Sequence, residues 1–344
     1  MIPSIEGVIT ADEVQATAAA IATLQLPDGM IPWYPGGHCD PWNHVETAMA
    51  LDVAGRHQEA AAAYRWLAGT QRRDGSWHSY YVADGVEDTK LDTNVCAYVA
   101  TGVWHHWLIT RDEALTAELW PVVAKATDWV LQLQTRRGEV IWAREVDRRP
   151  WSYALLTGCS SIAHSLECAV ALADLIGESR PDWELSLVNL TDVLRTCPDA
   201  FADKSRWAMD WYYPVLTGVL TGDDARQRLA DGWDTFVMAG RGVRCVSNEP
   251  WVTAAETAEC ALAHLAVGEA EAATDLLRWT RAHRCPDGAY LTGLVYPQQL
   301  PFPGGERTAY TGAAIILAAD ALSGATAASD LFVPASALAD DPDV

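Results

Sequence analysis

The feature that most constrains the fold of this chain is an internal repeat. When the sequence is shifted onto itself, residues 46–75 align with residues 259–288 without a gap, and glutamate, alanine, arginine, tryptophan and glycine positions coincide. A tryptophan followed nine residues later by a glycine occurs at Trp66, Trp129, Trp233 and Trp279. Self-similarity of this kind indicates stacked copies of one supersecondary unit.

Each repeated unit is predicted to be a pair of helices. Alanine-rich stretches with helical apolar periodicity follow one another along the chain, and none of them shows convincing strand alternation. They cover residues 11–25, 43–54, 56–71, 91–109, 114–134, 157–176, 183–197, 211–221, 224–238, 251–267, 269–284 and 307–322. We therefore predict an all-α fold, an (α/α)6 toroid or barrel of about twelve antiparallel helices in six hairpins.

The connections between these helices alternate between tight turns and long segments. The long segments span residues 27–41, 75–90, 138–151, 240–250 and 288–305. In an antiparallel array they fall at one end, so we expect them to cover a central cavity and to carry function. We predict a single domain over residues 1–322, followed by a flexible acidic tail over residues 323–344.

Composition excludes several classes of partner. The 344 residues include 24 Lys and Arg against 46 Asp and Glu, and a net charge of −22 disfavours binding to nucleic acid. Residues 1–10 lack the basic and apolar regions of a signal peptide, and no run of about 18 apolar residues indicates a membrane span. Eight scattered cysteines form no C-x-x-C pair. We expect a cytoplasmic protein with a small-molecule substrate, whose oligomeric state the sequence leaves open.

One repeat matches a known motif. The run Trp66-Leu67-x-x-x-Gln71-x-x-x-Gly75-x-Trp77 matches the core of the QW repeat of squalene-hopene-type terpenoid cyclases, and three other segments match it in part. The chain thus resembles the α/α toroid superfamily of terpenoid cyclases and protein prenyltransferase β-subunits, and small actinobacterial proteins labelled prenyltransferase. The resemblance implies this fold and a biosynthetic enzyme that acts on an isoprenoid.

The residues that carry chemistry in those families are absent from this sequence. It contains no Asp-x-Asp-Asp acid motif of the class II cyclases and no Asp-x-Cys zinc ligands of the protein prenyltransferases. It also lacks the phosphate-binding and metalloprotease motifs. We predict no metal site and no cofactor, and a divalent metal would be needed only if the substrate is a diphosphate.

The acids that repeat are interpreted as structural. Glu46 and Glu259 precede a turn by as many residues as Arg65 and Arg278 follow it, so in a hairpin each pair comes level. We therefore predict two Glu–Arg bridges between paired helices. An active site is usually asymmetric, and repetition argues against a catalytic role for these glutamates.

The candidate catalytic residues are instead polar side chains near helix starts. They are Asp40, His44, Asp92, Asp210 and Glu256. Asp40 and Asp92 can equally be helix caps, since each lies near the start of a predicted helix, and Asp40 is followed by a proline. His38, Cys39, Asp40 and His44 could also ligate a metal, but their spacing fits no known ligand set.

The candidate substrate-binding residues are aromatic and polar side chains, most of them in or beside the long segments. They are Trp33, His38, Trp42, Tyr81, Asn94, Trp151, Tyr212, Tyr213, Arg244, Trp251 and Tyr310.

Three functions remain open. The repeat match favours prenyltransferase- or terpenoid-cyclase-like acid/base chemistry on an isoprenoid or related small molecule in an aromatic-lined cavity. The alternative is an (α/α)6 carbohydrate-active enzyme, glycosidase- or epimerase-like, with paired carboxylates and aromatic platforms. The 16 Trp and 11 Tyr against 4 Phe suit sugars better than hydrocarbons. The third function is a non-catalytic binding protein.

Overall fold

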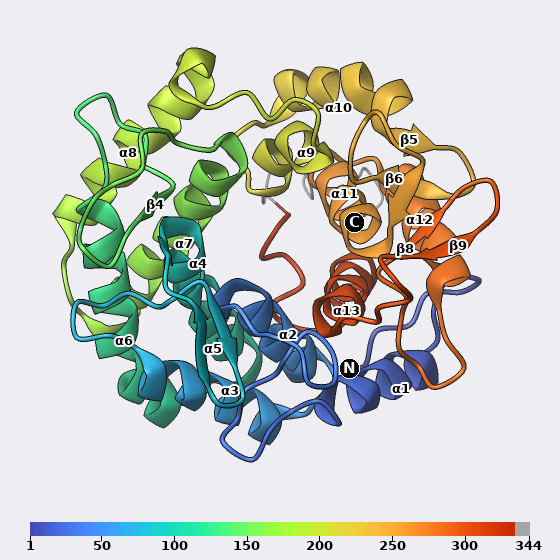
Figure 1. Cartoon of the computed structure of the whole chain (residues 1–344), viewed down its shortest axis with the longest axis horizontal. Coiled ribbons are helices and arrows are strands. Elements are labelled where there is room, and N and C mark those ends of the chain that lie inside the picture. Colours follow the sequence, from blue (N-terminus) through green and yellow to red (C-terminus); the bar gives the residue numbers. More distant parts are fainter. Residues whose placement is uncertain (334–344) are drawn as a thin grey trace. The chain divides into compact units, whose positions relative to one another are not determined.

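A computed structural model of the chain describes residues 1–333. The chain forms two compact units, which we treat separately. Unit 1 contains residues 1–24, 50–56 and 205 onward, and unit 2 contains residues 25–49 and 57–204. Helices predominate in both units (Figure 1). The prediction of a single domain remains a prediction.

Unit 2 is built from helices that follow one another in the chain. They are α2 (Pro41–Val53), whose last turn belongs to unit 1, α3 (His57–Thr70), α4 (Thr93–Ala97), α5 (Val99–Thr110), α6 (Glu113–Leu131), α7 (Leu156–Ile176), α8 (Pro181–Thr196) and the 3₁₀ turn η1 (Pro198–Ala200). The stretch predicted as one helix over residues 91–109 is two helices that meet at Tyr98.

Unit 1 has the same helical character. Its helices are α1 (Ala11–Ala22), α9 (Ala208–Leu216), α10 (Gly222–Phe236), α11 (Ala254–Ala266), α12 (Ala270–Trp279), the 3₁₀ turn η2 (Thr280–His283) and α13 (Ala309–Ser323). α13 is apolar on every side and largely buried, whereas α10 buries only Ala225, Leu229 and Phe236. A helix that is apolar on all sides, such as α13, is buried among other elements. An amphipathic helix, such as α10, packs its apolar face inward and leaves its polar face exposed.

One described helix, α7, is long and apolar enough to cross a membrane by length and composition alone. No such stretch was expected from the sequence. About two thirds of its apolar window is buried, and it packs against α5 and α8 inside unit 2. This burial is typical of a core helix in a globular unit.

The long segments contain short strands that the sequence analysis did not predict. In unit 2, β1 (Tyr80–Val82) pairs with β2 (Gly85–Asp88), and β3 (Leu91–Asp92) pairs with β4 (Ala143–Arg144). In unit 1, β5 (Val237–Met238), β6 (Gly242–Arg244), β7 (Trp251–Thr253), β8 (Gly293–Val295) and β9 (Leu300–Phe302) form one antiparallel sheet in this order. Strands of two to four residues are too short to show an alternating pattern in sequence.

The glutamines of the repeat join neighbouring helices through main-chain carbonyls. Gln71 Nε2 donates to the carbonyl of Gly75 at 3.0 Å and to that of Val122 in α6 at 2.8 Å. Gln134 repeats this arrangement with Gly138 and with Ser186 in α8, at 2.9 Å each. The motif residues that suggested a cyclase are therefore structural braces.

Close approach explains the glycine of the same motif. Gly75 has a φ of +98°, and a Cβ at this position would lie 2.2 Å from the carbonyl oxygen of Lys125 in α6. No side chain fits there without moving the α6 backbone, and the left-handed conformation also favours glycine.

The predicted Glu–Arg bridges are wrong. Arg65 is half exposed and pairs with Glu118 of α6 at 3.0 Å, and Arg278 pairs with Asp275 in its own helix. Glu46 is buried and Glu259 is bonded to a tyrosine hydroxyl. Arginines level with these glutamates in the hairpin point toward other partners, because level positions on two helices need not face each other.

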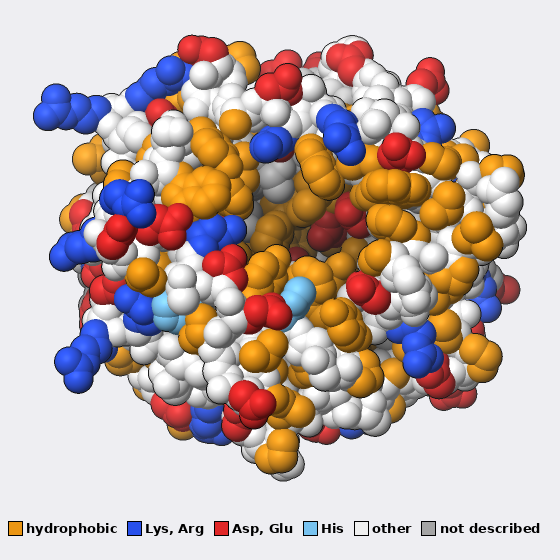
Figure 2. Space-filling view, in the orientation of Figure 1, with side chains coloured by type: hydrophobic (Ala, Val, Ile, Leu, Met, Phe, Trp, Pro, Cys, Tyr) orange, Lys and Arg blue, Asp and Glu red, His pale blue; other side chains and the backbone are white. Residues whose placement is uncertain are grey.

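Part of the predicted tail is folded. Within residues 324–333, Ala328, Phe332 and Val333 are buried. The remaining tail residues, 334–344, lie outside the described part of the chain. On the face seen in Figure 2, acidic and basic side chains are interspersed with hydrophobic ones.

Candidate active site

Asp40 is a buried acid at the start of α2. Its Oδ1 accepts the N–H of Asn43 at 3.0 Å, as a helix cap does, and its Oδ2 accepts the Nδ2 of Asn43 and the indole N–H of Trp33, both at 2.7 Å. Burial raises the pKa of Asp40, and these donors oppose that effect. The cap role and the acid role therefore coexist in one side chain.

Glu46 lies further along the same helix and is also buried. Its Oε1 accepts the indole N–H of Trp42 at 3.1 Å and the hydroxyl of Tyr98 at 3.3 Å. Burial first, and the charge of Asp40 second, raise the pKa of Glu46 to about 8. Two carboxyl groups that interact through their charges cannot both ionise easily, and such a pair is typical of acid/base sites.

Asp92 is a second buried cap, at the start of α4. Its Oδ1 accepts the N–H of Asn94 at 3.0 Å and that of Val95 at 3.2 Å. Burial raises the pKa of Asp92 to about 6, while Lys90, with Nζ 3.9 Å from Oδ2, lowers it. The charges of Asp40 and Asp92 both act on Tyr80, so these three side chains belong to one region of unit 2.

Aromatic rings lie beside the acids. Trp33 and Tyr80 both contact His38, with ring centroids 4.4 and 4.5 Å from it. The His38 Nδ1 lies 3.1 Å from a Glu87 oxygen, and its Nε2 is buried with no partner among residues 1–333. Asn94 Oδ1 is in the same situation within the described chain. Buried polar atoms without partners are places where ligand hydroxyls can bind.

A second aromatic group comes from the hairpin that contains β4. We call Trp142, Trp151 and Tyr153 the ring cluster; Lys90 Nζ lies 4.2 Å from the Trp142 ring centroid, and the Trp142 side chain hydrogen-bonds to Asp92. The ring cluster is thereby attached to the acid region.

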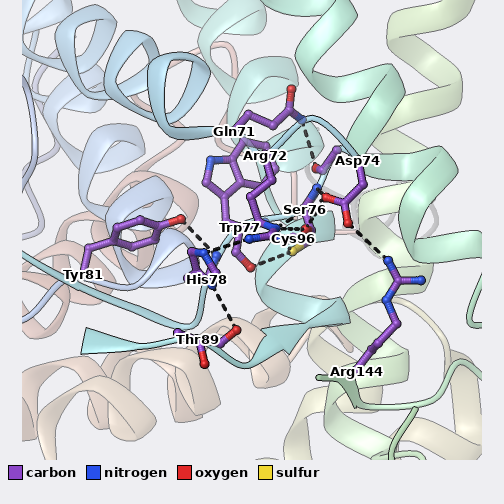
Figure 3. Close-up of polar contacts among 11 residues, drawn as sticks. Gln71, Arg72, Asp74, Ser76, Trp77, His78, Tyr81, Thr89, Cys96 and Arg144 are labelled. Carbon is purple, nitrogen blue, oxygen red and sulfur yellow. Dashed lines mark hydrogen bonds and ion pairs between the residues drawn. The ribbon is translucent and has the colours of Figure 1, made fainter. Parts of the chain in front are cut away.

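The hairpin is held from its other side by Arg144. This guanidinium is buried, lies 5.1 Å from the Trp129 ring centroid and pairs with Asp74 at 3.3 Å. Figure 3 shows this ion pair next to the bond network of Gln71, Ser76 and His78. The repeat turn after α3 thus braces the segment that carries the ring cluster.

The side chains of two predicted site residues of unit 2 contact other partners than these groups. His44 Nδ1 accepts the N–H of Ile31 at 3.2 Å, its Nε2 donates to the carbonyl of Ala63 at 2.9 Å, and burial lowers its pKa to about 4. The Tyr81 hydroxyl accepts the N–H of His78, and its ring packs on Trp66. Both side chains are engaged in packing and main-chain bonds.

Unit 1 has its own acid group, on α11. The hydroxyl of Tyr212 donates to Glu259, and the charges of Glu259 and Glu256 both act on this tyrosine. Burial raises the pKa of Glu256. This shift favours the neutral form of the Glu256 carboxyl, which makes Glu256 a candidate acid.

The other predicted residues of unit 1 are dispersed over several elements. Asp210 and Tyr213 are buried in α9. Arg244 Nη1 donates to the carbonyl of Thr235, and the Trp251 ring stacks on Phe302 with the ring centroids 4.6 Å apart. Tyr310 lies in the first turn of α13. Nothing in these contacts gathers all of them around one point.

Several residues of the unit 2 site were missed or dismissed from sequence. Glu46 was interpreted as structural because it repeats. The sequence does not single out four others from the many polar and aromatic residues in their segments: Tyr80, Lys90, Trp142 and Tyr153. The only available signal was the density of Trp and Tyr around residues 142–153. No group of three or more His, Cys, Asp or Glu side chains within residues 1–333 could hold a metal ion.

Comparison with known proteins identifies the family to which this chain belongs. No family model matches the chain. Among curated proteins, the chain is 50% identical over 331 residues to the "MMP endo-(1,4)-3-O-methyl-alpha-D-mannosidase" of Mycolicibacterium hassiacum, and the match covers 96% of this chain and 92% of that protein.

Solved structures show the same fold. A wild-type glycosidase matches with a TM-score of 0.70 at 18% identity, over 92% of this chain and 97% of that chain. A D-mannose isomerase matches with 0.69 at 12%, over 90% and 95%. A GH63 mannosylglycerate hydrolase from Thermus thermophilus matches with 0.63 at 13%, over 89% and 99%. The predicted (α/α)6 fold class is confirmed.

These findings correct the resemblance drawn from the repeat. The prediction of a prenyltransferase- or terpenoid-cyclase-like biosynthetic enzyme is wrong, because the full-length relative is a mannosidase and the structural neighbours include glycosidases. The findings support the carbohydrate-active alternative instead. The chain belongs to the family of the MMP endo-(1,4)-3-O-methyl-alpha-D-mannosidase, a family of glycosidase-type enzymes.

Proposed function

We propose that this chain is an endo-acting glycoside hydrolase that cleaves (1,4) linkages in chains of 3-O-methyl-α-D-mannose. The observation that carries the proposal is the 50% identity to a curated mannosidase, which extends over nearly the whole of both chains. The acids and rings of unit 2 have the chemistry that such a reaction requires.

Glycoside hydrolysis needs a protonated acid beside the glycosidic oxygen and an ionised carboxylate that activates water or attacks the sugar. We assign the acid role in unit 2 to Glu46, whose pKa of about 8 keeps it protonated at neutral pH. Both of its hydrogen-bond donors approach Oε1, so the proton lies on Oε2, from which it can pass to the leaving oxygen.

Asp40 is the matching carboxylate. Its three donors, from Trp33 and Asn43, stabilise the ionised form, and its negative charge in turn favours the neutral form of Glu46. Two carboxyls whose surroundings separate their pKa values are typical of an acid and a base in one site. In unit 1, Glu256 meets the chemical requirement for an acid, and the experiment below includes it.

The test is hydrolysis of defined oligosaccharides by the purified chain. We expect internal cleavage of (1,4)-linked 3-O-methyl-α-mannose octasaccharides, seen by mass spectrometry as a ladder of shorter products, and no cleavage of the corresponding α-glucan. Asp40→Asn and Glu46→Gln are expected to lose at least about a hundredfold in kcat, the effect of removing a general acid or base.

The same assay separates the individual assignments. Glu256→Gln at full activity would remove Glu256 from consideration, whereas full activity of Glu46→Gln together with loss in Glu256→Gln would transfer the acid role to Glu256. Failure of the wild-type chain to cleave any mannoside would contradict the proposed function itself.

A further inference from the structure

We propose that the ring cluster is a sugar subsite whose Trp151 and Tyr153 rings recognise the methyl ether of the ligand, and that Lys90 holds this subsite in shape. The inference rests on the proposed function, because it assigns residues to the recognition of a methylated mannoside.

The three rings form a corner rather than a flat platform. The Trp142 and Trp151 centroids are 4.7 Å apart with an interplanar angle of 81°, and Trp151 and Tyr153 are 5.9 Å apart at 73°. A flat sugar face stacks best on one ring, whereas rings at steep angles enclose a small apolar group from two sides. An O-methyl group has this size and polarity.

All three rings are only partly buried, so some of their surface is accessible to a ligand. Their positions are nevertheless fixed. The main-chain N–H of Trp142 donates to the carbonyl of Tyr153 at 3.0 Å, and the main-chain N–H of Trp151 donates to the carbonyl of Ala143 at 2.8 Å. The indole N–H of Trp151 donates to the Glu145 carboxylate at 3.0 Å. A binding corner that is already ordered loses little entropy when the ligand arrives.

Lys90 divides the cluster into an anchored part and an accessible part. Its ammonium lies 4.2 Å from the Trp142 centroid but 5.8 Å from that of Trp151, and it is 3.9 Å from Asp92. Because the ammonium covers Trp142, the rings left to meet a methyl group are Trp151 and Tyr153. Their link through Lys90 to Asp92 places the corner beside the acid region.

The experiment compares two tetrasaccharides of (1,4)-linked α-mannose, one 3-O-methylated and one unmethylated. Binding is measured by calorimetry in the full chain carrying Asp40→Asn, and kcat/KM is measured in the chain with Asp40 intact. We expect at least about tenfold preference for the methylated sugar, within the range that one methyl group can give in a fitted pocket.

Trp151→Ala and Tyr153→Ala are each expected to reduce this preference to below about threefold while leaving most of the affinity for the unmethylated sugar. The matched control is Trp207→Ala, since Trp207 is an exposed tryptophan in unit 1 and is 48% accessible. We expect it to keep the full preference. Having two corner variants keeps the test decisive if one of them does not fold.

The corner variants are Trp151→Ala and Tyr153→Ala, and the parent chain is the chain without either change. Equal losses of affinity for both sugars in the folded corner variants would overturn the subsite, and so would the absence of a preference in the parent chain. In both cases hydrolysis would still support the proposed function. If the parent chain cleaves neither sugar, the proposed function fails, and the dissociation constants still decide the subsite. A preference that Trp151→Ala abolishes supports it, and a preference that survives in both corner variants overturns it.

Discussion

The hydroxyl of Tyr98 donates a hydrogen bond to Glu46, and the hydroxyl of Tyr212 donates one to Glu259, the repeat equivalent of Glu46. Each unit therefore pairs its repeated glutamate with a tyrosine from another element: Tyr98 lies at the junction of α4 and α5, and Tyr212 lies in α9. Around this shared element the surroundings differ, since Glu46 responds to the charge of Asp40, whereas Glu259 has Glu256 in its neighbourhood.

Glu46 makes stability depend on pH. Its pKa rises from 4.5 to about 8 on folding, so the folded chain binds this proton more tightly than the unfolded chain. The resulting stability is fully present below pH 4.5 and is lost as pH rises through 8, with a slope of at most about 1.4 kcal/mol per pH unit. We expect Glu46→Gln to flatten the fall of the melting temperature between pH 5 and 8, while exposed Glu118→Gln should not. A parallel fall in both variants would contradict the assignment.

Asp40 should separate capping from catalysis. Asparagine is as good a helix cap as aspartate, but its Nδ2 would face the two donors that Oδ2 of Asp40 accepts, so Asp40→Asn is expected to cost about 1–3 kcal/mol of unfolding free energy and to remove activity. Asp40→Ala should lose activity and, because it also removes the cap, about 1 kcal/mol more of stability. Urea denaturation and initial rates give both values. An Asp40→Asn variant that is active but unstable would show that Asp40 serves as a cap only.

The glycines test close approach against backbone conformation. Gly55 and Gly75 both have positive φ, but a Cβ at Gly55 would meet nothing within 4 Å. We expect Gly55→Ala to cost about 1 kcal/mol and Gly75→Ala at least about twice as much, because the latter also forces the turn after α3 away from α6. Equal midpoint shifts in urea would mean that the α6 backbone yields easily.

Arg144 should act on sugar binding rather than on the chemical step. Arg144→Ala removes the ion pair with Asp74 and loosens the hairpin of the ring cluster, so we expect KM to rise about tenfold with kcat nearly unchanged. The control is Arg149→Ala, since Arg149 is exposed on the same hairpin and pairs with Asp147. A fall in kcat with constant KM would contradict a positioning role.

Much of the scaffold could be predicted from the sequence because its signals are local. α7 was expected over residues 157–176 and occupies Leu156–Ile176, since apolar periodicity is continuous there. Glu46 was interpreted as structural because it repeats. Its proposed acid role depends on its contact with Tyr98 and on the charge of Asp40, and no repeat or spacing connects these three residues. The ring cluster depends on pairing between β3 and β4, strands too short to see in sequence.

The function was misread for a related physical reason. Gln71 binds the turn after α3 and the neighbouring helix α6, and Gly75 allows their close approach, so the pattern of these residues reports the architecture. The side chains proposed to meet the substrate carry no such pattern. A resemblance built on scaffold residues therefore transfers the fold and leaves the chemistry open.

The glutamine braces have a consequence for how such a scaffold can diverge. Gln25, Gln71 and Gln134 each bind a main-chain carbonyl of a helix further along the chain, contributed by Glu59 of α3, Val122 of α6 and Ser186 of α8. A carbonyl is present whatever side chain stands at the acceptor position, so an acceptor helix can change its sequence freely without loosening the joint. The surrounding helices and loops can therefore accumulate substitutions that change substrate specificity, while the side-chain amides of these three glutamines preserve the helix contacts.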